Sequence, residues 1–363
     1  MKNSLPFFLI LILLSYSAFS QKDAVDQLLL KDFKPVSIYA IPITIPPKAK
    51  FPVIDMHSHP YAQSIADLDG WVKTMDQMGI TKTIILTGSA GAKFDSLVDV
   101  YRKYPDRFEL WCSFDYTGYD KPGFGPAAVK ELERCLKKGA KGVGELGDKG
   151  EGEIYSKPVP GYGMHMDDAR MKPLLKKCAE LRMPVNVHIA EPYWMYLPAD
   201  STNDGLINAA TWKVNIKPGM LDHAGLIKSL ENVVRENPKT LFIACHFANC
   251  EYDLSIVGRL LDKYSNLYLD ISARYAETAT IPRYMQKFYS QYQDRLLYGT
   301  DMGMDKSMYQ VTFRVLETLD EHFYETSLFG YHWAMNGFGL SDTILEKLYM
   351  KNALKIQNYE NER

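Results

Sequence analysis

The sequence predicts an α/β protein whose eight parallel strands close into a (β/α)8 TIM barrel. Two observations support this fold. Apolar, β-branched runs alternate with amphipathic helical segments through most of the 363 residues. The strand-like runs number eight, which is the number of strands in a closed barrel of this kind. The expected strands are Val53–Met56, Lys82–Leu86, Phe108–Phe114, Ala140–Glu145, Pro184–Ile189, Leu241–His246, Asn266–Ile271 and Leu296–Asp301.

A doubly wound open sheet is the alternative fold for an alternating pattern. Such a sheet usually carries a glycine-rich phosphate loop after its first strand. In this chain the corresponding residues are His57, Ser58, His59 and Pro60, with no glycine among them. We therefore prefer the barrel.

The segments between the strands carry helical periodicity. In Ile65–Met78 the apolar residues fall on one face, and Gly79 follows where a helix would stop. The helix expected at Asp168–Leu181 begins with two acidic residues and carries lysines later, which matches the helix dipole. The other clear helical patterns are Phe94–Tyr104 and Ala127–Lys138.

The first fifty residues are expected to lie outside the barrel. Residues 1–20 have the layout of a cleaved secretory signal peptide, with a positive start, an apolar run at Leu5–Leu14 and a small-x-small site. The apolar run is too short to span a bilayer, although a retained membrane anchor is the alternative. Residues 21–50 contain several prolines and are read as an N-terminal extension on the barrel exterior, and residues 51–363 as the barrel domain. The mature protein is therefore expected to be exported, either to the periplasm or as a secreted protein.

Composition argues against a nucleic-acid partner and leaves small-molecule substrates open. The net charge is −2, so the chain has no basic footprint for nucleic acid. Its five cysteines fit neither a disulfide framework nor a zinc knuckle, and they are read as small buried apolar residues. A Cys245–Cys250 disulfide and a homo-oligomer are both left open.

Histidines and acidic residues stand where several of the predicted strands end. Because the strands of a closed barrel end at the same rim, these side chains should meet. Histidine nitrogens and carboxylate oxygens are the donors that divalent ions such as zinc use in catalytic sites. The residues are His57 and His59 at the first strand, Glu145 at the fourth, His188 at the fifth, His246 at the sixth and Asp301 at the eighth.

The pattern predicts a catalytic metal site at the C-terminal ends of the strands. Residues two apart on a strand face the same side, so His57 and His59 can grip one ion. A catalytic site leaves one position to water, whose pKa the ion lowers. Asp301 is placed to take the proton of that water and later pass it to a leaving group. The other histidines are read as hydrogen-bonded core or pocket-lining residues: His165, His223, His322 and His332.

Three long connections are expected to form the walls of a substrate pocket above this site. All three follow strands, and they cover residues 146–166, 190–221 and 302–340. Tyr193 and Trp194 in the second connection either stack on a substrate ring or pack within the loop. Arg274, after the seventh strand, either binds a substrate carboxylate or pairs with Glu277.

These motifs resemble those of the amidohydrolase superfamily of metal-dependent barrels. The resemblance covers nearly all of Phe51 to Tyr359, and the nearest branch is the amidohydrolase-related group, amidohydrolase family 2. VIDMHSHP is similar to the first-strand His-x-His of the family, and VNVHIAEP, LFIACHFAN and RLLYGTDMG are similar to its fifth, sixth and eighth strand motifs. The closing MKNALKI resembles the helix that ends many members. The resemblance implies metal ligation by His57, His59, His188 and Asp301, with His246 as a catalytic or second-metal residue.

One segment departs from that branch. KGVGELG looks more like the metal-dependent deoxyribonuclease branch, in which the acid of the fourth strand bridges two ions. If Glu145 does so, the site holds two ions and His246 is a ligand. Otherwise the site holds one ion and His246 polarises the substrate. Zinc is the expected metal, with manganese or iron as alternatives, since residue types alone do not separate them.

The resemblance and the strand-end residues together predict an enzyme. The first hypothesis is a metal-dependent hydrolase whose activated water attacks a small carbonyl substrate, namely an amide, an ester or a lactone. The alternative on the same residues is a decarboxylase or hydratase of an aromatic or dicarboxylic acid, which needs a cation such as Arg274 for the substrate carboxylate. Ranked below these are a phosphoesterase or nuclease and a non-catalytic binding protein.

Overall fold

The structure, a computed structural model, describes residues 26–152, 154, 161–208 and 213–361. The predicted signal peptide, residues 1–20, lies outside the described residues, as does the start of the predicted extension. Within the described part of the chain, no helix is long and apolar enough to cross a membrane.

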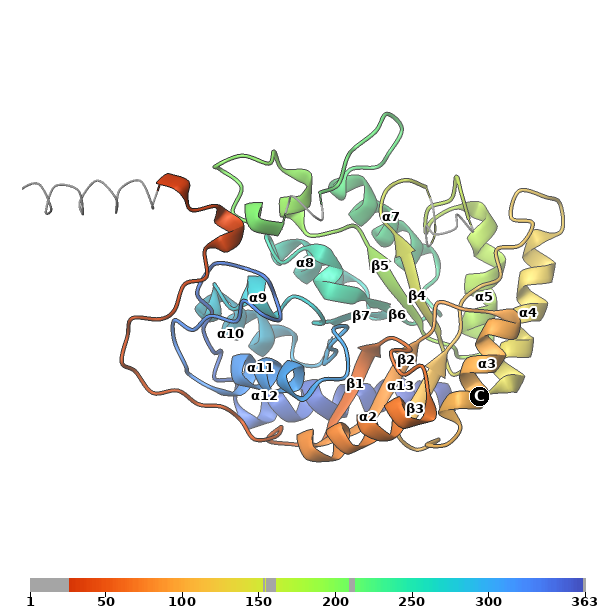
Figure 1. Cartoon of the computed structure of the whole chain (residues 1–363). Coiled ribbons are helices and arrows are strands. Elements are labelled where there is room, and N and C mark those ends of the chain that lie inside the picture. Colours follow the sequence, from red (N-terminus) through yellow and green to blue (C-terminus); the bar gives the residue numbers. More distant parts are fainter. Residues whose placement is uncertain (1–25, 153, 155–160, 209–212, 362–363) are drawn as a thin grey trace, which may run out of the picture.

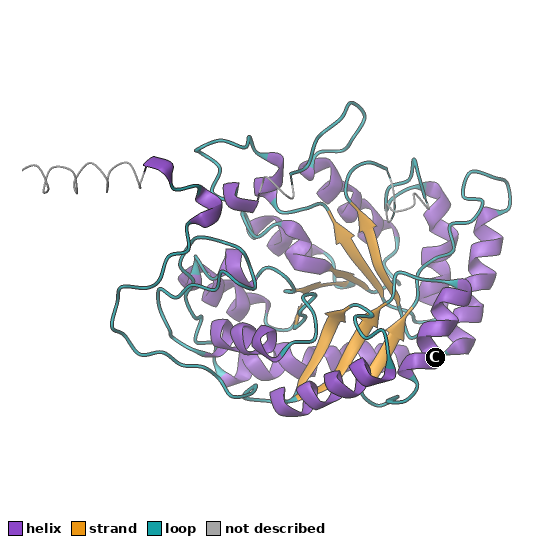
Figure 2. Cartoon of the chain, viewed as in Figure 1, coloured by secondary structure: helices purple, strands orange, loops and turns teal. Residues whose placement is uncertain are grey.

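Parallel strands and helices alternate around a central ring, as Figures 1 and 2 show. The strands pair as two parallel sheets, in the orders β1-β2-β3 and β4-β5-β6-β7-β8. Each strand pairs with the next one in the chain, which is the order that a (β/α)8 barrel requires. Their bounds are β1 Val53–Ser58, β2 Ile80–Leu86, β3 Phe108–Trp111, β4 Val143–Asp148, β5 Val185–Ile189, β6 Phe242–Ala244, β7 Leu267–Asp270 and β8 Leu296–Leu297.

Backbone hydrogen bonds join the two sheets at both of their edges. Beyond the end of β3, Cys112 N donates to Gly142 O at 3.0 Å, and Gly144 N donates to Cys112 O at 2.8 Å. On the other side, β1 meets the segment that follows β8, where Met56 N donates to Tyr298 O at 2.9 Å. The predicted barrel is therefore confirmed.

Helices cover the outside of the ring (Figure 1). The predicted helix at Ile65–Met78 has those bounds in the structure, because Ser64 Oγ accepts a bond from Asp67 N at its start and Gly79 adopts a left-handed backbone with φ 79° at its end. The helices are α2 Ile65–Met78, α3 Gly91–Tyr101, α4 Phe124–Lys138, α5 Lys172–Glu180, α7 His223–Glu236, α8 Ser255–Lys263, α9 Tyr275–Thr278, α10 Pro282–Tyr292, α11 Lys306–Glu317, α12 Asp342–Glu346 and α13 Asn352–Asn361.

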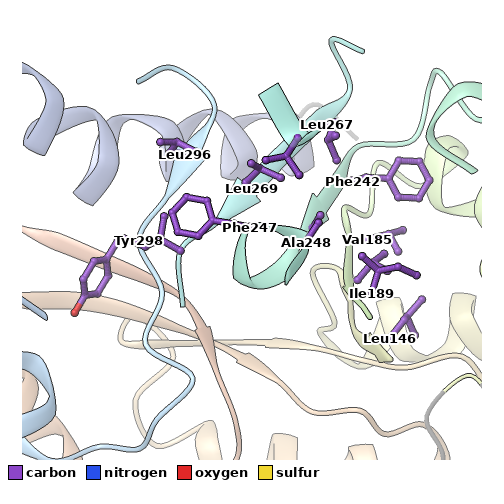
Figure 3. Close-up of a cluster of buried hydrophobic side chains, with 14 of the residues drawn as sticks. Leu146, Val185, Ile189, Phe242, Phe247, Ala248, Leu267, Leu269, Leu296 and Tyr298 are labelled. Atoms are coloured by element: carbon purple, nitrogen blue, oxygen red, sulfur yellow. The ribbon is translucent and has the colours of Figure 1, made fainter. Parts of the chain in front are cut away.

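The apolar core has two parts. The larger part lies between strands and helices, and Figure 3 shows its portion around β5 to β8, including Val185, Phe242 and Leu269. The smaller part contains strand residues together with Ala353 and Ile356 of α13, so this last helix packs against the barrel interior. The strand residues of the smaller part are Ile54, Met56, Ile84, Leu86, Trp111, Ile243 and Leu297.

The described part of the predicted N-terminal extension runs along the outside of the barrel. Thr44 N donates to Asp320 Oδ2 at 2.7 Å, and Ala49 N donates to Met78 O at 3.0 Å. The division of the chain at residues 20 and 50 remains a prediction. All five cysteines are buried, and the structure contains no Cys245–Cys250 disulfide.

Candidate metal centre

Six side chains that the sequence singled out meet at the C-terminal ends of the strands. The carboxylate of Glu145 lies among the histidines, with Oε1 2.8 Å from His188 Nδ1 and 3.4 Å from His246 Nε2. Asp301 Oδ1 lies 3.0 Å from His59 Nε2 and 3.5 Å from His57 Nε2. The predicted convergence of these residues on one rim is therefore what the structure shows.

A register shift aims His57 into the barrel. Ile54 and Met56 belong to the interior core cluster, so strict alternation along β1 would turn His57 towards the other face. The pairing of β1 with β2 shifts between Asp55 and Ser58, where the register includes one extra residue on β1. An irregularity of this kind re-aims the side chains that follow it.

Glu145 is aimed by a similar irregularity. Val143 and Leu146 both pack in the outer core, although they are three residues apart. The pairing with β5 shifts between these two residues, since Val143 is paired with Val185 and Leu146 with Val187. Glu145 can therefore face the barrel interior while Val143 and Leu146 both face outwards.

His246 and Asp301 lie just beyond strands that end earlier than predicted. The sequence predicted strands to His246 and to Asp301, but β6 ends at Ala244 and β8 at Leu297. Both residues have a left-handed backbone, with φ 57° for His246 and φ 58° for Asp301. Non-glycine residues adopt this conformation rarely, and it occurs often at functional sites. Both side chains lie at the barrel mouth, beyond the ends of their strands.

Asp55 joins β1 to the turn that carries Asp301. Its Oδ1 accepts bonds from His57 N and Thr300 N, each at 3.1 Å, and its Oδ2 accepts one from Thr300 Oγ1 at 2.7 Å. Burial raises the pKa of Asp55 to about 7. Gly299 allows this turn to lie close against β1, because a Cβ atom at position 299 would lie 2.7 Å from His57 Cβ.

Three of the four histidines have one ring nitrogen hydrogen-bonded outside the cluster of ligands. His57 Nδ1 lies 2.9 Å from Asp270 Oδ2, and His59 Nδ1 lies 3.0 Å from Leu86 O. His246 Nδ1 lies 2.9 Å from Ser272 O. These contacts leave Nε2 of all three facing the carboxylates. His188 is reversed, since its Nδ1 faces Glu145 and its Nε2 lies 3.4 Å from Glu191 Oε2.

Sequence reasoning missed the supporting residues Asp270, Ser272 and Glu191. Asp270 is fully buried at the end of β7, and a buried acid at a strand end was a signal that could have identified it. Burial alone would raise its pKa, but the charge and hydrogen bond of His57 outweigh burial and lower the pKa to about 2. Such orienting partners fix the tautomer of a metal-binding histidine.

Charge attraction shifts the pKa values of the acids and of three of the histidines, whereas burial lowers the pKa of the fourth, His246. Burial alone would raise the pKa of Glu145, but His188 and the neighbouring hydrogen bonds hold it well below its usual range. Burial would lower the pKa of His188, but the charge of Glu145 raises it to about 9. The pKa of Asp301 is also lowered, since the charge of His57 outweighs burial.

The donor set fits a divalent metal ion. His57 Nε2 is buried and has no hydrogen-bond partner, although two carboxylates lie 3.5 and 3.7 Å away. A buried polar atom without a partner is costly unless something binds it. Imidazole nitrogens and carboxylate oxygens are the ligands that catalytic zinc, manganese and iron sites share. One ligand atom each from His57, His59 and Asp301 lies within 4.8 Å of the others.

Arg274 is buried and already paired. Its Nε and Nη2 donate to Asn249 Oδ1 at 3.0 and 2.6 Å, and its Nη1 donates to Ala273 O at 3.0 Å. Its Nη1 also lies 3.6 Å from Glu277 Oε1, so the pairing with Glu277 that the sequence left open is present, in the interior rather than at the surface.

The aromatic residues after β5 pack against other connections. Tyr193 stacks on Tyr252, with ring centroids 4.0 Å apart. Trp194 meets Tyr331 edge to face at 6.3 Å, and its indole nitrogen is buried without a hydrogen-bond partner. The second and third long connections therefore meet, and their role as walls of a substrate pocket remains a prediction.

The remaining histidines lie outside this cluster. His165 Nδ1 bonds Asp148 at 3.0 Å, and His223 Nε2 lies 2.7 Å from Asn249 O. His322 Nδ1 lies 3.3 Å from Ser37 Oγ, while His332 Nδ1 is buried without a partner.

Comparisons with known proteins agree with this arrangement. Residues 47–356 match the family model described as Amidohydrolase. A search of curated proteins found no match. Among solved structures the chain is similar to a TIM-barrel protein of Bordetella bronchiseptica, at 17% identity and a TM-score of 0.55, over 86% of this chain and 100% of that chain.

Two enzymes of solved structure share the fold. One is 2,6-dihydroxybenzoate decarboxylase from Rhizobium, at 15% identity and a TM-score of 0.54, over 86% of this chain and 100% of that chain. The other is 5-carboxyvanillate decarboxylase from Novosphingobium aromaticivorans, complexed with manganese, at 16% identity and a TM-score of 0.53, over 87% of this chain and 100% of that chain. At these identities the likeness shows a shared fold.

Proposed function

Because the chain belongs to the amidohydrolase family, whose members are metal-dependent enzymes, we propose that it hydrolyses a small carbonyl substrate. The substrate class is an amide, an ester or a lactone, and zinc is the proposed metal. His57, His59, His188 and Asp301 are the proposed ligands, and Glu145 and His246 join them when two ions are bound.

The position of Glu145 carries this proposal. Its carboxylate lies within 3.7 Å of the facing nitrogens of all four histidines, with individual distances of 2.8, 3.4, 3.5 and 3.7 Å. A carboxylate in that position supports a centre in which Glu145 contacts the metal. Such a centre suits the activation of water better than it suits the binding of a second, substrate carboxylate.

The residues of the chain have separate roles in this reaction. A divalent ion, when bound here, polarises the substrate carbonyl and lowers the pKa of water. Asp301 accepts the proton of the attacking water at a carboxylate oxygen, since its side chain is 23% exposed at the rim. It then returns the proton to the leaving group. Asp270 keeps His57 aimed throughout.

Decarboxylation or hydration of an aromatic or dicarboxylic acid is the second candidate. It is supported by the fold that the chain shares with two decarboxylases of aromatic acids. It requires a cation for the substrate carboxylate, and the proposed cation, Arg274, is engaged by Asn249 and Glu277. That engagement is why we place hydrolysis first.

Metal content and substrate class test the proposal together. The purified protein should contain one or two divalent ions per chain by elemental analysis, and the His57→Ala/His59→Ala variant should contain none. The loaded protein is then given esters, lactones and amides in one panel and aromatic carboxylic acids in another. Carbon dioxide release without hydrolysis would favour the second candidate. Absence of bound metal after supply of zinc, manganese and iron would overturn both.

We also propose that the protein is exported after cleavage near residue 20. The support is the sequence layout of residues 1–20 alone. N-terminal sequencing of the protein from the extracytoplasmic fraction tests this, and an intact Met1 in the cytoplasmic fraction would contradict it.

A further inference from the structure

Cys245 lies beside the proposed ligands, although its sequence position suggested an ordinary core residue. One ligand atom from each of His57, Glu145, Cys245 and His246 lies within 4.8 Å of the others, and all four side chains are buried. Cys245 directly follows β6, where Ala244 faces the outer core, so alternation turns Cys245 inwards. Its Sγ lies 2.7 Å from Asn186 Oδ1, on the neighbouring strand β5.

A second observation points to a ligand in the same group of atoms. His57 Nε2 is completely buried and has no hydrogen-bond partner, and it lies 3.7 Å from Glu145 Oε1. This buried nitrogen therefore lies next to the carboxylate of the same group of possible ligand atoms. The other cysteines differ: Cys250 Sγ, for example, bonds Ala248 O at 3.4 Å and belongs to no such group.

We propose that Cys245 supplies a thiolate sulfur to the metal ion, so that the centre has nitrogen, oxygen and sulfur donors. This inference rests on the proposed metal-dependent function, and it adds Cys245 to the ion that Glu145 and His246 would bind. Binding breaks the S–H bond of Cys245 and forms a sulfur–metal bond, and the thiol proton is released to solvent. A soft thiolate favours zinc and cobalt over manganese, so the proposal also predicts which metals bind best.

The distances are compatible with a shared ion. Zinc lies about 2.3 Å from sulfur and about 2.1 Å from nitrogen, so two donors of one tetrahedral ion are about 3.6 Å apart. The four donor atoms lie within 4.8 Å of one another, so the most widely separated pair has to approach by up to about 1 Å when the ion binds. Asn186 holds the sulfur on the inner side of the barrel before the ion binds.

Cobalt and cadmium report directly on sulfur ligation. The native protein is stripped with a chelator and titrated with cobalt(II) chloride, and separately with cadmium(II) chloride, while absorbance and bound metal are both recorded. We expect a thiolate-to-metal charge-transfer band in the near ultraviolet that saturates with the bound metal. This measurement uses the unmodified protein, so it does not depend on the folding of a variant.

Variants assign the band to one residue. Cys245→Ser keeps a similar size and a hydrogen-bonding group for Asn186, and it should lose the band and bind zinc at least about tenfold more weakly. Cys250→Ser, which replaces another buried cysteine five residues further on, is the matched control. It should keep the charge-transfer band and the zinc affinity of the native protein. A charge-transfer band that persists in Cys245→Ser would overturn the role of Cys245. So would metal bound to the native protein without any such band. Either result would leave the proposed function intact. No bound metal in the native protein would overturn the proposed function and this inference with it.

Discussion

At the scale of single residues, His57 is held in place by a carboxylate from far along the chain. Asp270, 213 positions away, lies 2.9 Å from its Nδ1 and leaves Nε2 facing Glu145 and Asp301. A histidine oriented in this way presents one fixed nitrogen to a metal ion. The ligand set therefore depends on Asp270 although that residue does not itself face the ion.

We predict that Asp270→Asn weakens zinc binding about 10- to 100-fold. The amide keeps the shape of the side chain but loses the charge that fixes the tautomer and raises the basicity of His57. Competition with a coloured chelator measures the affinity. Asp262→Asn, at an exposed position on α8, is the control and should bind zinc as the native protein does. Equal affinities in both variants would show that His57 needs no orienting carboxylate.

Arg274 should stabilise the folded protein, whether or not it also binds a substrate carboxylate. Its guanidinium lies 3.6 Å from Glu277 and 4.0 Å from Glu251, and all three side chains are at most 10% exposed. Burial raises the pKa of Glu251 to about 7, so this acid carries charge above that pH. Removal of the cation would leave both acids buried and unpaired.

We therefore expect Arg274→Met to lower the free energy of unfolding at pH 8 by about 3–5 kcal/mol. Urea denaturation measures this quantity. Arg102→Met, in an exposed pair with Asp99, should change it by less than about 0.5 kcal/mol. A loss at Arg274 no larger than at Arg102 would mean that the acids do not depend on the cation.

At the scale of elements, the sequence predicts which residues share the rim but not how each is aimed. Strand-helix alternation places His57, Glu145 and Asp301 together, because parallel strands of a barrel end at one side. The aim of His57 and Glu145 depends on register shifts that arise from pairing with β2 and β5. No local pattern marks those shifts.

The ends of helices and strands are likewise predictable from the sequence only where a local signal marks them. The helix at Ile65–Met78 was predictable to the residue, because Ser64 and Gly79 are local capping signals. The strand at Leu296–Asp301 was predicted too long, since the chain leaves the ladder after Leu297. Cys245 was read as core because its neighbours along the chain are apolar, while its neighbours in space are the proposed ligands.

The contact between α3 and α4 should make stability depend on pH. Glu131 on α4 accepts bonds at 2.8 Å from Arg134 Nε, Arg134 Nη2 and Gly91 N, the last at the start of α3. The hydrogen bonds from Arg134 are the main cause that lowers the pKa of Glu131 from 4.5 to about 2. A lowered pKa in the folded state stabilises the protein above pH 4.5, and this stabilisation is lost as the pH falls towards 2.

We predict that Glu131→Gln reduces the loss of stability between pH 5 and pH 3. A glutamine cannot titrate, so this contribution is absent at both values. Thermal unfolding at the two pH values gives the difference. Glu133→Gln, on the same helix but 41% exposed, is the control. It should lose as much stability between pH 5 and pH 3 as the native protein does. An unchanged difference in Glu131→Gln would assign the acid sensitivity to other carboxylates.

At the scale of the whole molecule, the proposed ion lies where both sheets meet. His57 comes from the first sheet, with His59 directly after its first strand, while Glu145 and His188 come from the second sheet and Asp301 from the segment that joins the two sheets. Two acids and four histidines lie in contact there, partly exposed at His59 and Asp301, and the buried His57 Nε2 has no hydrogen-bond partner. An ion bound there would link distant parts of the barrel, so its free energy of binding should add to that of folding.

Removal of the metal should therefore destabilise the entire barrel. A ligand that binds only the folded state adds about 2.7 kcal/mol at a free concentration 100 times its Kd. We expect the Tm of the native protein to fall on treatment with a chelator and to rise with the logarithm of free zinc. The His57→Ala/His59→Ala variant should show neither change, because it lacks the histidines of β1. An equal rise in that variant would place the stabilising ion elsewhere in the molecule, and the strand-end cluster would then owe its burial to histidine–carboxylate pairing alone.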